Sequence, residues 1–227
     1  MAKLNKQILG RVQGALGDIT FRQRNGKSFL STRPVSFMPG MDAASVERRA
    51  KFGLSIKLAK SIYSISELKP LWAVDAAPDV SPFNHLMRTN YTMINATDLS
   101  GLIRLAPSLG FNAAHPVIEL GPSEVKVNID AIGTSAGIDE AAEASLKLVS
   151  VVYLSDPVDN MVGKSTFLTF VSDARDTDLA SAQEFTFTLS DVESQMFAKY
   201  QNRKGFFAVL TLDAAGNAVH YSNTFIG

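Results

Sequence analysis

The chain has 227 residues, 22 basic and 22 acidic side chains and no cysteine, which allows one large domain or two small ones. Apolar residues make up 46% and charged residues 19% of the chain, as in folded globular proteins and unlike disordered ones. The absence of cysteine excludes disulfides, iron–sulfur clusters, thiolate zinc sites and cysteine nucleophiles. The net charge of zero conceals two opposite halves, with 13 Lys/Arg against 4 Asp/Glu through Lys69 and 9 against 18 from Pro70 onward.

The N-terminus does not have the pattern of a secretory signal. Lys3 and Lys6 are followed by only two consecutive apolar residues before Arg11, far fewer than a signal peptide contains. No later stretch approaches the roughly 20 apolar residues of a membrane helix. We therefore expect a cytoplasmic protein, or one assembled into a virion or similar particle, with no signal peptide and no membrane partner.

Residues 1–40 are predicted to form a basic arm and a β-hairpin. Residues 18–24 and 27–33 alternate with period two, and Asn25-Gly26 between them is the strongest short signal for a type I′ turn. An isolated hairpin is marginally stable in water. This one must lie on the body of the protein, on a neighbouring subunit or on a polyanion.

Two short helices are expected next. In the first, over about 42–66, Asp42 is the predicted N-cap, and apolar residues recur at helical spacing. Pro70 should end or offset this helix. A second helical segment covers about 71–96, where Pro82 suits a helix start.

From about residue 100 the pattern changes to that of β-strands. The expected strands are 101–106, 116–120, 124–130, 145–154, 164–172, 183–189, 204–212 and 217–226. Seven or eight short strands with turn residues between them predict an antiparallel β-sandwich of the immunoglobulin or fibronectin type. The candidate core aromatics are Phe167, Phe170, Phe185, Phe187, Phe206 and Phe207, with about half of each run pointing inward.

The predicted fold class is therefore mainly β with a small α part. The expected organisation is a basic arm and hairpin over 1–40, a helical segment over 41–99, and a β-sandwich domain over 100–227. The edge strands of such a sandwich need covering. The hairpin, the arm or a neighbouring subunit could cover them by strand addition.

The histidines do not indicate a metal or catalytic site. His85, His115 and His220 lie at no known ligand spacing from one another or from a carboxylate. A metal site would therefore require three separate elements to converge. No nucleophile motif is present either, so we expect a non-enzymatic protein with no catalytic residues, no cofactor and no metal.

Two acidic stretches and one glycine motif contain residues that occur in cation-binding or phosphate-binding loops. The stretches are 139–143 and 173–178, and the second lacks the central glycine and the spacing of a calcium loop. Gly163-Lys164-Ser165 lacks the upstream glycine of a phosphate-binding loop. The second stretch is interpreted as a solvated loop between strands, and the glycine motif, which is followed by β-rich sequence instead of a helix, is not interpreted as a nucleotide site.

The basic residues near the N-terminus form the candidate contact site for a polyanion or another subunit. They are Arg22, Arg24, Lys27, Arg33, Arg48, Arg49 and Lys51. Arg22 and Arg24 share one face of a strand, with Phe21 on the other. Such a face can neutralise phosphates and release counterions, or it can meet the acidic remainder of the same chain or the next subunit. It can also be a solvated face with no partner.

Several motifs of this region occur together. They are Gly10, Gly14, Gly17 and Asp18, the stretch Arg-Gln-Arg-Asn-Gly-Lys at 22–27, Arg33-Pro34, and Arg-Arg-Ala-Lys-Phe at 48–52. They resemble the N-terminal signature of an uncharacterised protein family common in Bacteroidota and their phages. The strand at 219–225, with its Ser-Asn step, resembles that family's C-terminus. The family is of unknown function, so the resemblance assigns no catalytic residue.

Two functional hypotheses follow. The first is a structural protein that self-assembles through its basic N-terminal arm and acidic β-sandwich, as a component of a phage or phage-like particle. Its partners are then copies of itself or other particle proteins. The alternative is a nucleic-acid-binding module that uses the basic hairpin and the first helix.

Overall fold

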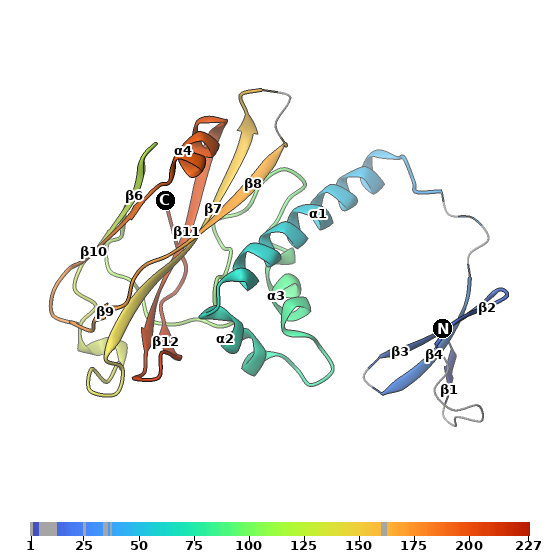
Figure 1. Ribbon diagram of the computed structural model, residues 1–227, viewed down its shortest axis with the longest axis horizontal. Helices are drawn as coiled ribbons and strands as arrows, with labels where there is room; N and C mark the ends of the chain where they lie inside the picture. The colour runs from blue at the N-terminus through green and yellow to red at the C-terminus, as the bar shows by residue number, and fades with distance from the viewer. Residues whose placement is uncertain (1, 5–12, 25, 34–35, 37, 160–162) are drawn as a thin grey trace. The chain divides into compact units, whose positions relative to one another are not determined.

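The computed structural model describes the whole chain except residues 1, 5–12, 25, 34–35, 37 and 160–162 (Figure 1). The chain divides into two compact units, Met1–Val46 (unit 1) and Glu47–Gly227 (unit 2). The fold is mainly β, with 36% strand and 25% helix, and its sheets are antiparallel, as predicted. No helix in the described part of the chain combines the length and apolar character needed to cross a membrane.

Unit 1 contains the predicted hairpin, extended by a strand on each side. The strands are β1 (Ala2–Leu4), β2 (Gly14–Leu16), β3 (Ile19–Arg24) and β4 (Lys27–Thr32), in the order β1-β4-β3-β2. Arg24 pairs with Lys27, so two residues connect β3 and β4. Gly26 has a positive φ of 72°, as a type I′ turn requires. Asn25 lies outside the described residues, so the turn type itself stays a prediction.

The described residues form four α-helices, and the prediction of two short helices is wrong in number and length. They are α1 (Ala43–Ser64), α2 (Leu68–Asp75), α3 (Pro82–Tyr91) and α4 (Asp191–Ala198). Asp42 caps α1 as predicted, since its Oδ1 accepts from the Ser45 N–H at 2.9 Å. Pro70 lies in the first turn of α2, where the missing N–H has no helical acceptor to lose. Pro82 begins α3, as expected.

Unit 2 contains two sheets. The smaller has the order β10-β6-β5, from β5 (Val117–Leu120), β6 (Glu124–Ile129) and β10 (Gln183–Thr188). The larger has the order β12-β11-β7-β8, from β7 (Ser145–Pro157), β8 (Ser165–Val171), β11 (Tyr200–Leu212) and β12 (Ala218–Tyr221). In addition, β9 (Arg175–Asp176) pairs with β7 and β13 (Phe225–Ile226) pairs with β11. A short 3₁₀ helix, η1, covers Thr134–Ala136.

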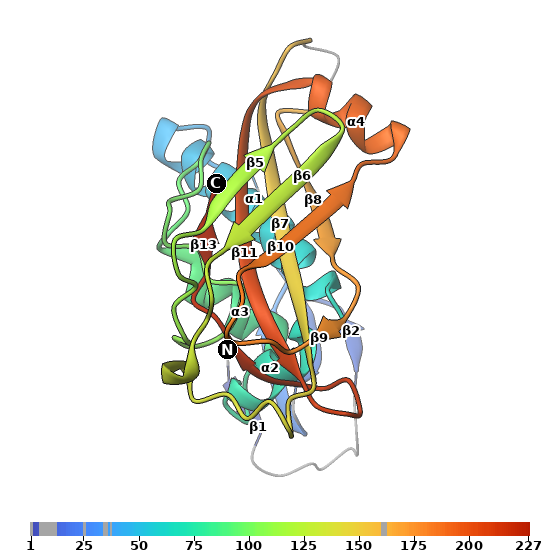
Figure 2. The ribbon, with the colours of Figure 1, turned by 90° about the vertical axis from the view of Figure 1, so that its left-hand side faces the viewer.

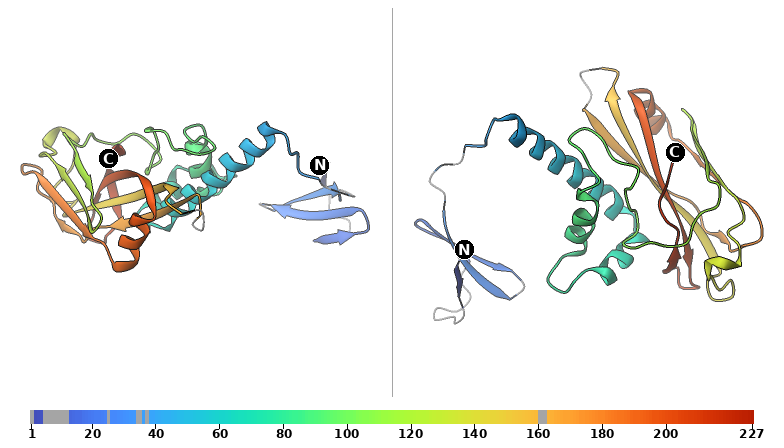
Figure 3. Two further views of the ribbon diagram at one scale, coloured as in Figure 1. Left: turned by 90° about the horizontal axis from the view of Figure 1, so that it is seen from above. Right: turned by 180° about the vertical axis from the view of Figure 1, so that it is seen from behind.

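The central strands β7 and β11 are covered on both faces. Helices α1–α3 lie on one face of the larger sheet and the smaller sheet lies on the other, as Figures 1, 2 and 3 show. Neighbouring residues therefore enter different cores: Phe206 packs in the cluster with Trp72, and Phe207 in the cluster with Phe185. Of the predicted core aromatics, only Phe167 is partly rather than fully buried. Alternation along strands with one covered face would bury about half of these six aromatics, whereas five of them are buried.

The predicted strand over 101–106 does not form. Its backbone bonds to side chains instead of to a neighbouring strand. The Asn90 amide accepts from the Arg104 N–H at 2.8 Å and donates to the Arg104 carbonyl at 3.0 Å. The Leu105 N–H donates to Thr224 Oγ1 at 2.9 Å. These contacts bury Ile103 and Leu105 without a strand ladder.

Replacing Asn90 with alanine is expected to lower the free energy of unfolding by about 2 kcal/mol, because both backbone groups of Arg104 lose their partner in a part-buried site. Urea denaturation followed by circular dichroism measures the change. Thr89→Ala is the matched control, since the Thr89 hydroxyl bonds only to its own helix at His85 O. Equal stability of the two variants would contradict this account of the segment.

Candidate functional site

The predicted basic residues belong to different units. Arg22, Arg24, Lys27 and Arg33 lie in unit 1, on or just after β3 and β4. Arg48, Arg49 and Lys51 lie on α1, in unit 2. The Lys51 Nζ lies 4.6 Å from the centroid of the Tyr91 ring. Whether the seven residues act together stays a prediction.

The part of unit 1 that the structure describes has almost no hydrophobic core. None of its described residues from Gln13 to Val46 is buried. Leu16 and Ile19, which pair across β2 and β3, are 73% and 37% exposed. Residues 1–46 carry seven Lys/Arg and two Asp/Glu, a net charge of +5, so residues 47–227 carry −5. Unit 1 therefore presents a basic, partly apolar surface.

Unit 2 contains a groove of about 1140 Å³ that we call the basic groove. Its walls are α1, the C-terminal end of β7 and the first residues of β8 and β11. Its charged lining residues are Arg49, Lys57, Lys164, Arg203 and Lys204, with Asp98 and Asp156. Five basic and two acidic side chains give this groove a positive potential.

The cations of the basic groove differ in how far they are already paired. Lys204 Nζ is held by Asp98 at 2.9 Å and by the Leu99 carbonyl at 2.7 Å. Lys57 makes one long bond, 3.4 Å to the Ser165 carbonyl. Among the described residues, neither Lys57 nor the exposed Lys164 forms an ion pair with a carboxylate. These two lysines are therefore the cations best placed to attract an anionic partner.

Arg203 forms part of the groove wall. Its guanidinium donates to the Leu120 carbonyl at 3.1 Å and to the Phe197 carbonyl at 3.4 Å, and it lies over the Phe197 ring. Its buried Nε–H has no acceptor within the described part of the chain. A buried donor without an acceptor is costly.

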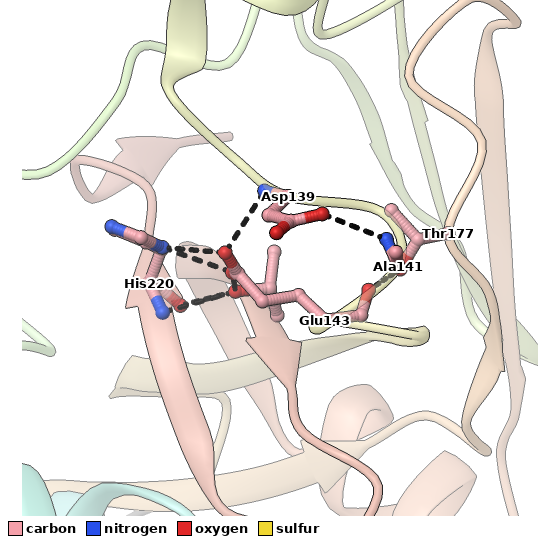
Figure 4. A network of polar contacts seen from close by, with 6 residues as sticks. Asp139, Ala141, Glu143, Thr177 and His220 are labelled. Atoms are coloured by element: carbon pink, nitrogen blue, oxygen red, sulfur yellow. Dashed lines mark hydrogen bonds and ion pairs between the residues drawn. The ribbon is translucent and has the colours of Figure 1, made fainter.

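A buried carboxylate anchors the opposite end of unit 2 (Figure 4). Glu143 is only 3% exposed. Its carboxylate accepts from the Thr211 hydroxyl, from His220 Nδ1 at 2.9 Å and from the Asp139 N–H at 3.1 Å. The network therefore ties the loop before β7 to β11 and β12. Sequence reasoning missed it, because nothing local marks Glu143 as different from the other acids of 139–143.

The hydrogen bonds decide the charge state of Glu143. Burial alone would raise the pKa of its carboxyl, but the bonds from Thr211, His220 and the Asp139 backbone outweigh burial and hold the pKa below its ordinary value of 4.5. The carboxylate is therefore ionised at neutral pH. His220 also lines a hollow of about 590 Å³ together with Asn112, Ser135 and Tyr221.

Each histidine lies beside one carboxylate that is distant in sequence. His85 Nε2 is 2.6 Å from Asp75 Oδ2, and His115 Nδ1 is 2.9 Å from Asp130 Oδ2. The third pair is His220 with Glu143. Within the described residues, no three metal-ligating side chains come together. The histidines lie in the elements that the sequence predicts, but their partners come from tertiary contacts.

A scan of protein-family models finds no match to this chain, and a search of curated proteins finds no relative. The resemblance of the N-terminal motifs to a Bacteroidota and phage family therefore stays a prediction.

Proposed function

We propose that this protein is a non-enzymatic structural component that self-assembles, with unit 1 of one copy docking on an acidic surface of another. The observation that supports this proposal is the absence of any buried residue in the described part of unit 1 from Gln13 to Val46. Small sheets without a buried face gain little hydrophobic stabilisation. A partner surface that covers Leu16 and Ile19 supplies that burial.

The outer face of the smaller sheet of unit 2 is a suitable acidic partner. Glu119, Glu124 and Glu184 surround a single cation on that face, Lys126. The hydrogen bond from Lys126 to Glu124, at 2.8 Å, and the charges of all three glutamates raise the pKa of Lys126. An excess of negative charge on a flat sheet face complements a basic sheet.

The proposal also covers the type of β-sandwich in unit 2 and the particle in which the protein assembles. The two sheets of unit 2 are proposed to form an immunoglobulin- or fibronectin-like β-sandwich. One buried cluster that joins Val127 of β6, Phe185 of β10 and Phe207 of β11 supports this arrangement. The N-terminal resemblance supports a phage or phage-like particle as the setting.

Light scattering coupled to size exclusion tests the self-assembly of the full chain. At about 50 mM salt the wild type should be oligomeric, and at about 500 mM salt its mass should fall, because screening weakens exposed charge pairs. Arg22→Glu/Lys27→Glu should have a clearly lower mass than the wild type at about 50 mM salt. The control is Lys60→Glu/Lys69→Glu, which makes the same change of charge on exposed helix positions of unit 2.

Two outcomes would contradict the proposal. A wild-type protein that stays monomeric at both salt concentrations does not self-assemble. If that monomer binds duplex DNA at low salt and Arg22→Glu/Lys27→Glu abolishes the binding, unit 1 is a nucleic-acid-binding module instead.

A further inference from the structure

Within unit 2, the basic groove and a group of exposed carboxylates lie at opposite ends of the long β7–β11 pair. The pairing runs from Pro157 with Tyr200 at one end to Ser145 with Leu212 at the other. At about 3.3 Å per residue, these ends are roughly 40 Å apart. The basic groove lies at the Pro157 end, since Pro157 and Asn202 line it.

The Ser145 end carries a group of carboxylates that we call the acidic end. Its members are Asp139, Glu140, Asp173, Asp176, Asp178 and Asp213. Asp176 pairs with Ser145, and the Glu140 carboxylate accepts from the Leu179 N–H at 2.9 Å. All six are exposed except Asp213, which is half-buried. None forms an ion pair with a cation of the described chain.

The one arginine of this region does not neutralise the acidic end. Arg175 donates to the Glu184 carbonyl at 2.5 Å and lies over the Phe185 ring, 4.3 Å from its centroid. Hydrogen bonds from Ser181 and Ala180 lower the pKa of Asp178, and bonds from Asn217 lower that of Asp213. The acidic end is therefore negatively charged at neutral pH.

The two ends cannot compensate each other within one copy. Their separation of roughly 40 Å is several times the screening length of about 8 Å at physiological salt. We propose that the acidic end of one copy docks into the basic groove of the next, so that copies of this chain associate head to tail. This inference rests on the proposed self-assembly and adds a second contact, distinct from that of unit 1.

The basic groove suits such a partner. Lys57 and Lys164 offer ammonium groups without a carboxylate partner among the described residues. Charge-assisted hydrogen bonds to carboxylates are stronger than neutral ones. Asp98 repels an acidic partner only weakly, because its charge is neutralised by Lys204. Asp156 also lines the groove, and its negative charge weakens the attraction. Because the groove and the acidic end are different surfaces, the contact is heterologous and generates rings or filaments.

A charge-reversal mixing experiment on the full chain tests this inference. Lys57→Glu/Lys164→Glu reverses the charge of the groove, and Asp173→Lys/Asp176→Lys reverses the charge of the acidic end at two exposed residues. Each variant alone should need at least about tenfold more protein to assemble, because like charges then meet at the contact. An equal mixture of the two should regain assembly, since every contact can again join opposite charges. Sedimentation velocity measures assembly, and electron microscopy distinguishes rings from filaments.

Thermal unfolding of each variant, together with the control Lys60→Glu/Lys69→Glu, shows whether the fold is retained. Wild-type assembly by both reversal variants would overturn the inference, and so would failure of the mixture to regain assembly. The proposed function would survive either result if Arg22→Glu/Lys27→Glu still lowers the mass of the assembly. If Lys57→Glu/Lys164→Glu assembles normally but loses binding to duplex DNA, the groove takes nucleic acid and the inference is wrong.

Discussion

Replacing Trp72 with alanine should lower the free energy of unfolding by about 4 kcal/mol. Trp72 is the only tryptophan of the chain, and it lies fully buried on α2 between the helices and the larger sheet. Its indole Nε1–H donates to the Leu105 carbonyl at 2.9 Å, and its ring meets the His85 ring edge to face. The alanine variant loses this buried surface and leaves the Leu105 carbonyl without a partner.

Urea denaturation of the Trp72→Ala variant, followed by far-ultraviolet circular dichroism, measures the loss. Trp72→Phe is the matched control, because it keeps most of the apolar volume and removes the indole donor. We expect this control to lie between the wild type and Trp72→Ala. A loss below about 1 kcal/mol in the alanine variant would mean that α2 is not part of the main core.

Replacing Glu143 with alanine should lower the free energy of unfolding by about 3 kcal/mol. The substitution leaves the buried Thr211 hydroxyl and the Asp139 N–H without their acceptor. His220→Ala is the control, because the His220 side chain is half-exposed and water can replace it. Equal losses for the two variants would show that the contact with His220 accounts for the whole effect, and that the bonds from Thr211 and the Asp139 N–H add no stability.

Glu143 should also make the free energy of unfolding depend on pH. The pKa of Glu143 is lower in the folded protein than its ordinary value of 4.5, so the folded state favours the ionised form. Its contribution to stability is complete above that ordinary value and is lost as the pH falls through the lowered folded pKa. Glu143→Gln does not titrate, so the stability difference between wild type and Glu143→Gln should shrink from pH 7 to pH 3. A constant difference over that interval would contradict the assignment.

Many elements of this fold were predictable from short stretches of sequence. The hairpin around Gly26, the cap at Asp42 and the start of α3 at Pro82 depend on residues within a few positions of each other. Helix α4 was missed, although its signal is present. Ser190 and Glu193 form a capping box, with reciprocal hydrogen bonds between side chains and backbone.

The candidate surfaces were less predictable. Glu143 and His220 lie 77 positions apart, and Lys204 and Asp98 lie 106 apart. No local sequence pattern predicts such ion pairs, because they depend on which segments become neighbours in the folded chain. The segment 101–106 has the composition of a strand, yet the Asn90 side chain takes the hydrogen bonds that a neighbouring strand would supply.

The sequence by itself determined that a basic N-terminal region and an acidic remainder share one chain, and where most strands begin and end. Charge content and backbone periodicity can be counted along the sequence, and periodicity depends only on near neighbours. The tertiary structure alone decided that β7 and β11 are buried on both faces, and that Lys57 and Lys164 lie at the opposite end of unit 2 from Asp173 and Asp176. Long-range strand pairing, set by burial of apolar side chains far apart in the chain, places these two lysines and these two carboxylates at opposite ends of unit 2.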